Sequence, residues 1–255
     1  MSLTRPWQRK APQSGHSRTP TQWIQATPPA ADALDLPLVG RLVWTELPVL
    51  AVIDLLITLG VAVVAVVAVT VAALAPLVAA VLIGPVWLGG TAICNRILGG
   101  DAVGPRDVFI EVGRRAATGT RIALLPGVVA TLLIGSLTIR SSGAASRSWM
   151  TLPIALDALI LVVVVFGSLT VFPLAVLTSL SGRARWLAAL ALAGRHLTVS
   201  AGLLAIVVLL IVSMKLVGPF LVLVAAGPFC LLVTATVRSV LIGPGADAIP
   251  HSQDR

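Results

Sequence analysis

LPVLAVIDLLITLGVAVVAVVAV, residues 47–69, is a continuous apolar run in which Asp54 is the single charged residue. A helix needs about 20 apolar residues to cross the hydrocarbon core of a bilayer, so this run predicts a membrane-spanning helix. The composition extends that prediction to the whole chain, because 57% of the 255 residues are hydrophobic, 11% are charged and the mean hydropathy is +1.01. We therefore predict an all-α, polytopic transmembrane helical bundle. Runs such as 61–69 lack the alternation of apolar and polar residues that a β-barrel needs.

Proline and glycine breakpoints divide the apolar sequence into six predicted spans. The second span is expected to kink at Pro85, the third to bend near Pro126 and Gly127, and the sixth to break at Gly227-Pro228. The expected spans are 47–69, 74–97, 120–139, 153–180, 199–214 and a last one from the turn at Gly218-Pro219 to about 240.

The segments outside the spans define the domain organisation and the orientation. Residues 1–41 hold several prolines and basic residues with no apolar stretch directly after the basic cluster, which predicts a disordered tail and not a cleavable signal peptide. The helical domain is expected over 42–241, with a short tail at 242–255. Fifteen of the eighteen Lys and Arg residues fall on one side of this threading. By the positive-inside rule, both tails and the two long basic loops are expected in the cytoplasm.

The membrane is expected to be the plasma membrane of a bacterium. Arginine greatly outnumbers lysine, tyrosine is absent, and alanine, valine, glycine and proline abound, which is typical of a GC-rich bacterial gene. The basic residues are scattered through loops that border spans and form no basic domain. Topology therefore explains the net charge of +8 better than nucleic-acid binding does.

Two basic segments, Gly113-Arg114-Arg115 and Gly194-Arg195-His196, lie in the predicted cytoplasmic loops. In the first loop, Pro105 is expected to open a short helix on the membrane surface that includes Arg114 and Arg115 and in which Glu111 and Arg115 can pair. Arg114, Arg115, Arg195 and His196 are expected to contact anionic lipid headgroups. The alternative is that they dock a membrane-protein partner. Residues 113–126 hold only a distorted version of the loop by which ABC permeases dock their ATPase, which makes ABC transporter components one candidate partner.

The two basic hairpins also suggest an internal repeat. Pro85 precedes Arg96 by eleven residues, and Pro173 precedes Arg183 by ten. Spans two and three would then form a parallel repeat of spans four and five. The alternative is that any inward-facing hairpin ends in arginines.

The first hairpin resembles the YesL-like family of small bacterial membrane proteins, a domain of unknown function (DUF624) found near sugar-utilisation genes. The resemblance covers about 85–140 and rests on Pro85, Ala92, Arg96, Gly99-Gly100, Phe109 and Arg114-Arg115. In that family a proline ends an apolar run, an alanine-rich helix follows, and a loop with a buried aromatic residue enters the next span. This chain differs in its few aromatic residues and in a longer apolar run before Pro85. The resemblance implies a role linked to solute uptake and supplies no catalytic residue.

Two acidic residues fall inside predicted spans. Asp54 is expected about ten residues, or roughly 15 Å, into the bilayer. A carboxyl group at that depth either faces the bundle interior and marks a solute or proton path, or stays protonated and hydrogen-bonds a neighbouring helix. Asp157 is expected near the outer interface, where Arg140, Arg147 or Lys215 can neutralise it.

No motif in the sequence indicates catalysis. The chain lacks nucleophile-elbow, Walker, dinucleotide-binding and zinc-protease motifs, and its three histidines are far apart. Cys94 and Cys230 are expected to be small buried hydrophobic side chains, not a disulfide or a metal site. We therefore expect neither enzymatic activity nor a cofactor. The sequence favours a transport-associated protein, permease-like or accessory to solute uptake. The alternative is a non-transporting scaffold or regulator that binds other membrane proteins.

Overall fold

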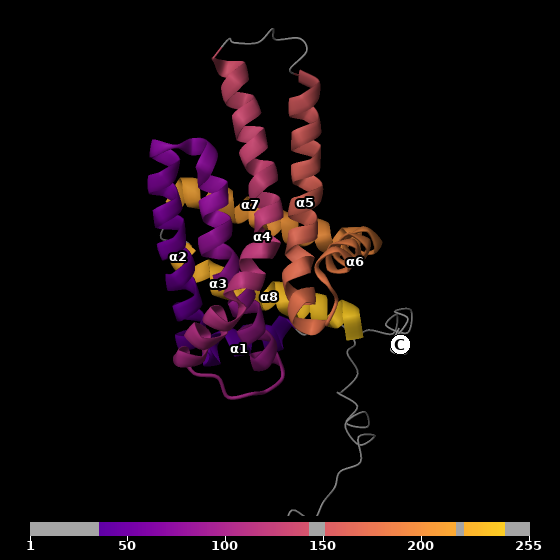
Figure 1. Cartoon of the computed structure of the whole chain (residues 1–255). Helices are drawn as coiled ribbons and strands as arrows, with labels where there is room; N and C mark the ends of the chain where they lie inside the picture. The colour runs from indigo at the N-terminus through magenta and orange to yellow at the C-terminus, as the bar shows by residue number, and fades with distance from the viewer. Residues whose placement is uncertain (1–35, 143–150, 218–221, 243–255) are drawn as a thin grey trace, which may run out of the picture. The chain divides into compact units, whose positions relative to one another are not determined.

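The computed structural model describes residues 36–142, 151–217 and 222–242, and it contains helices and no strand within them (Figure 1). The prediction of an all-α bundle is confirmed. The described helices all belong to one compact unit. Their bounds are α1 Leu36–Thr45, α2 Leu47–Thr70, the 3-10 helix η2 Ala72–Leu74, α3 Ala75–Leu98, α4 Pro105–Ser141, α5 Thr151–Leu177, α6 Gly182–Arg195, α7 Leu197–Val217 and α8 Val222–Ile242.

Five helical segments in the described part of the chain are long and apolar enough to cross a membrane. They are Leu47–Thr70, Ala72–Leu98, Pro105–Ser141, Thr151–Leu177 and Val224–Leu241. The pair α6 and α7 passes the same test as one span, but the two helices meet at an angle of 98°. The structure therefore agrees with the predicted number of apolar spans, at five or six.

The first helix begins earlier than expected. The predicted disordered tail extended to residue 41, whereas α1 begins at Leu36. Pro37 occupies the first turn of α1, where the missing N–H of a proline costs the helix no hydrogen bond. The rest of that tail up to residue 35, the turn at 143–150, the predicted turn at Gly218-Pro219 and the tail from 243 lie outside the described residues.

Helix α4 corrects the prediction of a separate surface helix followed by a span. It is one continuous helix of 37 residues, so the short helix that carries Arg114 and Arg115 runs into the following span without a break. The first half packs against α3: Val108 is fully buried, and a Cβ placed on Gly89 would lie 2.6 Å from the Cγ2 atom of Val112. The apolar stripe therefore faces protein and not the membrane surface, while Phe109 is exposed.

Two glycines bring the backbones of α3 and α4 into contact. A Cβ placed on Gly119 would lie 2.7 Å from the carbonyl oxygen of Gly84, and one on Gly84 would lie 2.8 Å from the carbonyl oxygen of Gly119. Neither position tolerates a side chain without moving a helix. Further along, Gly127 packs in the same way against Pro76 and Ala80 of α3.

Buried side chains form two main clusters around these helices. One joins α2, α3 and α8 through residues that include Leu50, Ile93 and Leu231. The other joins α3, α4, α5 and α6 and includes Leu88 and Val171. Helix α3 belongs to both clusters, which makes it the central helix of the described bundle.

The predicted hairpin repeat has a partial counterpart in the structure. In each half, a helix with an internal proline, Pro85 in α3 or Pro173 in α5, is followed by a short connection and another helix. That next helix is continuous in the first half, as α4. In the second half it is divided at His196 into α6 and α7.

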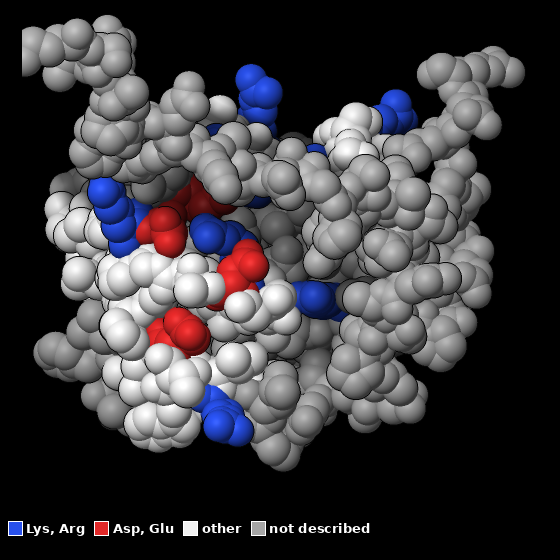
Figure 2. Space-filling model, turned by 90° about the horizontal axis from the view of Figure 1, so that it is seen from below, with Lys and Arg blue, Asp and Glu red and all other residues white. Residues whose placement is uncertain are grey.

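Charged side chains gather at one end of the bundle. Figure 2 views the molecule from the side on which α1 and the α3–α4 connection lie in Figure 1, and basic and acidic side chains lie next to one another there. At this connection Arg96 forms an ion pair with Asp101 at 3.5 Å, and the Asp107 carboxylate caps α4 by accepting a hydrogen bond from the Gly104 N–H at 2.9 Å.

The glycine contact between α3 and α4 predicts opposite effects for two matched substitutions in α4. Gly119→Ala places a Cβ against the α3 backbone and should lower the free energy of unfolding by about 1–3 kcal/mol. Gly113→Ala meets nothing within 4 Å and should raise it by about 0.5–1 kcal/mol through helix propensity. Thermal unfolding of the purified variants in detergent measures both effects. Equal melting temperatures for the two variants would contradict the observed packing.

Candidate functional site

Asp54 lies inside the bundle and bonds to the backbone of a distant helix. The break expected at Gly227-Pro228 is not observed, because α8 is one helix over Val222–Ile242. Its side chain is 3% exposed, and its Oδ1 atom accepts a hydrogen bond of 2.5 Å from the backbone N–H of Gly227. Gly227 precedes Pro228, an internal proline of α8. The contact therefore ties α2 to α8 across 173 residues of sequence. Of the two interpretations made from the sequence, this geometry corresponds to a carboxyl group bonded to a neighbouring helix.

Small residues allow this contact to form. A Cβ on Gly227 would lie 2.9 Å from the carbonyl oxygen of Leu50 and 3.1 Å from the Asp54 Oδ2 atom. On α3, Gly90 faces Ile53 of α2 and the sulfur of Cys230 on α8, at 3.3 and 3.5 Å from its ideal Cβ position. Helices α2, α3 and α8 can therefore approach closely around the carboxylate.

The two cysteines belong to this same region. Cys94 on α3 and Cys230 on α8 are both fully buried free thiols in the first hydrophobic cluster. The sequence predicted their burial but gave no sign that both would pack between α3 and α8, because their separation of 136 residues has no meaning before the helices are paired.

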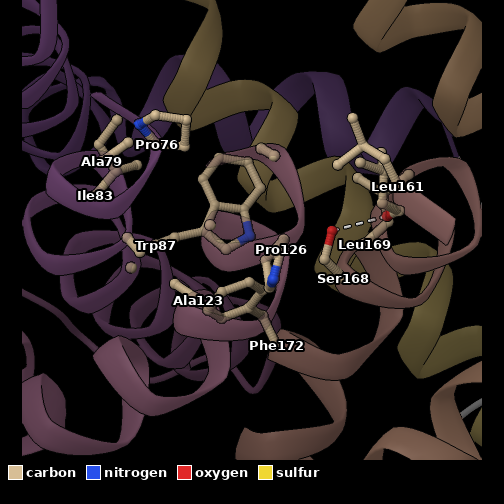
Figure 3. A pocket seen from close by; sticks show the side chains of 15 residues that line it. Pro76, Ala79, Ile83, Trp87, Ala123, Pro126, Leu161, Ser168, Leu169 and Phe172 are labelled. Carbon is tan, nitrogen blue, oxygen red and sulfur yellow. Dashed lines mark hydrogen bonds between the residues drawn. The ribbon is translucent and has the colours of Figure 1, made fainter. Parts of the chain in front are cut away.

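A cavity of about 350 Å³ lies between α3, α4 and α5 (Figure 3). Trp87 and Ser168 supply the polar side-chain groups of its wall, and the Ser168 hydroxyl already donates a hydrogen bond of 2.7 Å to the carbonyl of Val165. The cavity therefore offers an apolar surface. Its lining residues are Pro76, Ala79, Ala80, Ile83, Gly84, Trp87, Ala123, Pro126, Gly127, Ala130, Leu161, Val165, Ser168, Leu169 and Phe172.

Prolines within helices shape the cavity. Pro126 belongs to its wall and is internal to α4, while Pro85 and Pro173 follow lining residues of α3 and α5. An internal proline removes one backbone hydrogen bond and disfavours straight helical packing at that point. Trp87 completes one side, and its ring lies 5.9 Å from that of Phe229 on α8, centroid to centroid.

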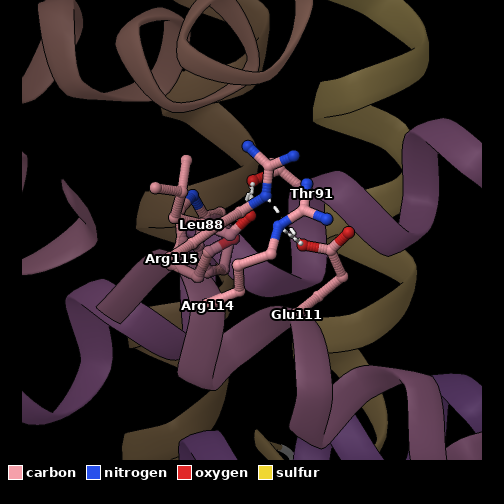
Figure 4. A network of polar contacts seen from close by, with 6 residues as sticks. Leu88, Thr91, Glu111, Arg114 and Arg115 are labelled. Atoms are coloured by element: carbon pink, nitrogen blue, oxygen red, sulfur yellow. Dashed lines mark hydrogen bonds and ion pairs between the residues drawn. The ribbon is translucent and has the colours of Figure 1, made fainter. Parts of the chain in front are cut away.

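The basic segment of α4 forms a small ion-pair network (Figure 4). The Arg115 Nε–H donates to the Glu111 Oε2 atom at 2.9 Å, which confirms the predicted pairing, and the Arg114 Nε atom lies 3.6 Å from the same oxygen. The Arg115 side chain is 23% exposed and that of Arg114 is 67% exposed. Arg114 is therefore the member of this pair that can reach a lipid headgroup or a partner.

The second basic segment marks the junction of α6 and α7. Arg195 is the last residue of α6, and His196 caps that helix, with its backbone N–H donating to the carbonyl of Leu192 at 3.1 Å. Both side chains are exposed. Within the predicted basic loop, Gly194 and Arg195 therefore form the end of a helix, and the chain bends at His196 into α7.

Asp157 bonds to a residue that the sequence did not indicate. The hydroxyl of Ser136 on α4 donates a hydrogen bond of 3.0 Å to its Oδ2 atom. Within the described residues, Arg140 forms no ion pair with Asp157. Arg147 and the side chain of Lys215 lie outside the part that the structure describes.

No group of three or more His, Cys, Asp and Glu side chains that could hold a metal ion occurs within 36–142, 151–217 and 222–242. No family model matches the sequence, and neither a curated protein nor a solved structure matches it. The YesL-like resemblance therefore stays a prediction, and a function for this chain has to be inferred from its own geometry.

The Asp54 contact predicts a graded loss of stability. Asp54→Ala leaves the Gly227 N–H without its acceptor in a buried site and should lower the free energy of unfolding by about 1–3 kcal/mol. Asp54→Asn keeps an acceptor oxygen and should lose less. The control is Asp101→Ala, which removes the carboxylate of an exposed ion pair and should cost at most about 1 kcal/mol. Thermal unfolding in detergent ranks the three, and an Asp54→Ala variant as stable as Asp101→Ala would contradict the proposed importance of the contact.

Proposed function

We propose that this chain is a transport-associated membrane protein, permease-like or accessory to solute uptake, and that the α3–α4–α5 cavity binds the apolar part of its solute. The observation that carries the proposal is the cavity itself, an open pocket about 350 Å³ in volume that is lined by apolar helices with internal prolines. This volume lies at the lower end of the range for small-molecule pockets. Spans interrupted by proline or glycine are typical of transporter binding regions.

The lining chemistry favours an amphipathic solute over a free sugar or an amino acid. A polar solute needs hydrogen-bond partners to replace its water, because burying unpaired polar groups is costly. The Trp87 indole is the main side-chain donor that the wall offers, and the Ser168 hydroxyl is already bonded within its own helix. An acyl or alkyl chain needs no such partners.

For the cellular setting, we propose the plasma membrane of a bacterium, with both chain termini and the charged end of the bundle in the cytoplasm. The positive-inside distribution of Lys and Arg supports this orientation. The exposed Arg114 and Arg195 would then contact anionic headgroups or a membrane-protein partner, including components of an ABC transporter.

Filling the cavity should reduce transport. Purified protein in phospholipid vesicles is expected to take up radiolabelled octanoylcarnitine, an amphipathic probe, faster than radiolabelled glucose. Ala130→Leu extends a side chain from the cavity wall and should lower octanoylcarnitine uptake by about tenfold, which corresponds to a loss of about 1.4 kcal/mol of binding. The matched control is Ala62→Leu on the exposed surface of α2, which should leave uptake unchanged.

Two outcomes would each exclude one part of the proposal. Equal uptake by Ala130→Leu and Ala62→Leu would exclude the cavity as the binding site. No uptake above that of empty vesicles would exclude a permease acting alone. Co-purification from gently solubilised membranes would then separate an accessory or scaffold protein, which keeps a membrane-protein partner, from one that runs by itself.

A further inference from the structure

Helix α4 carries an internal marker for the position of the bilayer. Arg121 is exposed, the next charged residue is Arg140, and residues 122–139 between them hold no charge. These 18 residues measure about 27 Å at 1.5 Å per residue, close to the roughly 30 Å of a hydrocarbon core. The lipid-crossing part of α4 is therefore its second half, and the part before Arg121 belongs to the charged end.

Close contacts between α3 and α4 show how far α3 extends along the charge-free segment 122–139. Gly84, near the middle of α3, faces Gly119 and Ala123, where the charge-free segment begins. Pro76, in the first turn of α3, has its carbonyl oxygen 3.0 Å from the ideal Cβ position of Gly127. The start of α3 is therefore level with the first half of the segment 122–139, and α4 continues for more than ten residues beyond Gly127.

Helix α2 also extends only as far as the first half of the segment 122–139. Its Gly60 packs against Ile83 of α3, and α2 ends ten residues later at Thr70. In Figure 1 the α2–α3 turn lies below the far ends of α4 and α5. The ten residues from Gly60 to Thr70 cover about 15 Å along the helix axis, which is half the thickness of a hydrocarbon core.

The turn between α2 and α3 has the chemistry of a segment in lipid. It reads Thr70-Val71-Ala72-Ala73-Leu74, and the chain holds no charged residue from 55 to 95. The side chains of Val69, Val71 and Leu74 are 89%, 47% and 47% exposed. Turns that meet water are rich in Gly, Asn, Asp and Ser, none of which occurs here.

The turn also satisfies much of its own backbone, as a segment without access to water must. The N–H groups of Val71, Leu74 and Ala75 donate to the carbonyls of Val67, Val71 and Ala72. The Thr70 hydroxyl bonds back to Val67 at 3.0 Å, and Pro76 has no N–H to satisfy.

From these placements we propose that α2 and α3 form a re-entrant hairpin. Its tip at 71–74 lies among lipid acyl chains near the middle of the bilayer and does not reach the surface at which α4 and α5 end. Asp54, six residues before Gly60, then lies in the headgroup layer and not deep in the hydrocarbon core. The α3–α4–α5 cavity then opens within the leaflet on the Arg121 side. The proposal is independent of the transport function.

Single-cysteine accessibility tests this placement. Ala72→Cys marks the tip, Ala102→Cys marks the charged end, and Ser142→Cys marks the far end of α4; all three positions are exposed. The wild type, with both native cysteines buried, is the blank. Membrane-impermeant maleimide is added to sealed vesicles of both orientations.

The Ala102→Cys and Ser142→Cys variants are expected to label from opposite sides of the membrane. The Ala72→Cys variant is expected to resist labelling from both sides. Its labelling rate should be at least about tenfold lower than the rates of the other two variants, because a thiol in apolar surroundings stays protonated and unreactive. It should label fully after denaturation in detergent.

A second measurement separates a tip in lipid from a tip shielded by protein. A nitroxide attached to the Ala72→Cys variant should collide with dissolved oxygen more often than with a water-soluble nickel chelate, while nitroxides at positions 102 and 142 should show the reverse. Impermeant labelling of the Ala72→Cys variant from either side would overturn the proposal. So would a nitroxide at position 72 that the nickel chelate reaches as readily as it reaches the one at 142.

Discussion

The approach of α3 to α4 at Gly84 and Gly119 is the contact on which the rest of the described structure depends. With no Cβ on either residue, each backbone packs directly against the carbonyl of the other helix. This contact holds the first half of α4 against α3, within the continuous helix Pro105–Ser141. The cavity begins next to the contact, with Gly84 and Ala123 in its wall. The same contact fixes how far α3 extends alongside the charge-free half of α4.

A polar contact complements this apolar packing on the other side of α3. Asp54 accepts the N–H of Gly227, the residue before the internal Pro228 of α8. A buried carboxylate needs hydrogen-bond donors, and this backbone N–H from another helix supplies one. The contact gives α8 a defined register on α2, whereas apolar side chains alone would allow small shifts along the helix axes.

Helix class and helix limits could be predicted from the sequence because they depend on local composition. The helix expected at 47–69 is observed as Leu47–Thr70, and the one expected at 74–97 as Ala75–Leu98. The continuity of α4 could not be predicted, because Gly119 resembles a loop residue until α3 is seen beside it. The pairing of Glu111 with Arg115 was predictable because it depends on spacing within one helix. The partner of Asp54 and the cavity were not, since both arise from helices far apart in the sequence.

The unbroken length of α4 has a mechanical consequence. A helix of 37 residues is about 55 Å long, and it is attached at one end to α3 while its other end contacts α5 through Ser136 and Asp157. Because the first half is fixed on α3 at Val112 and Gly119, these contacts also set the direction of the second half. The position of Ser136, about 25 Å along the helix from Gly119, is therefore determined by packing at the charged end.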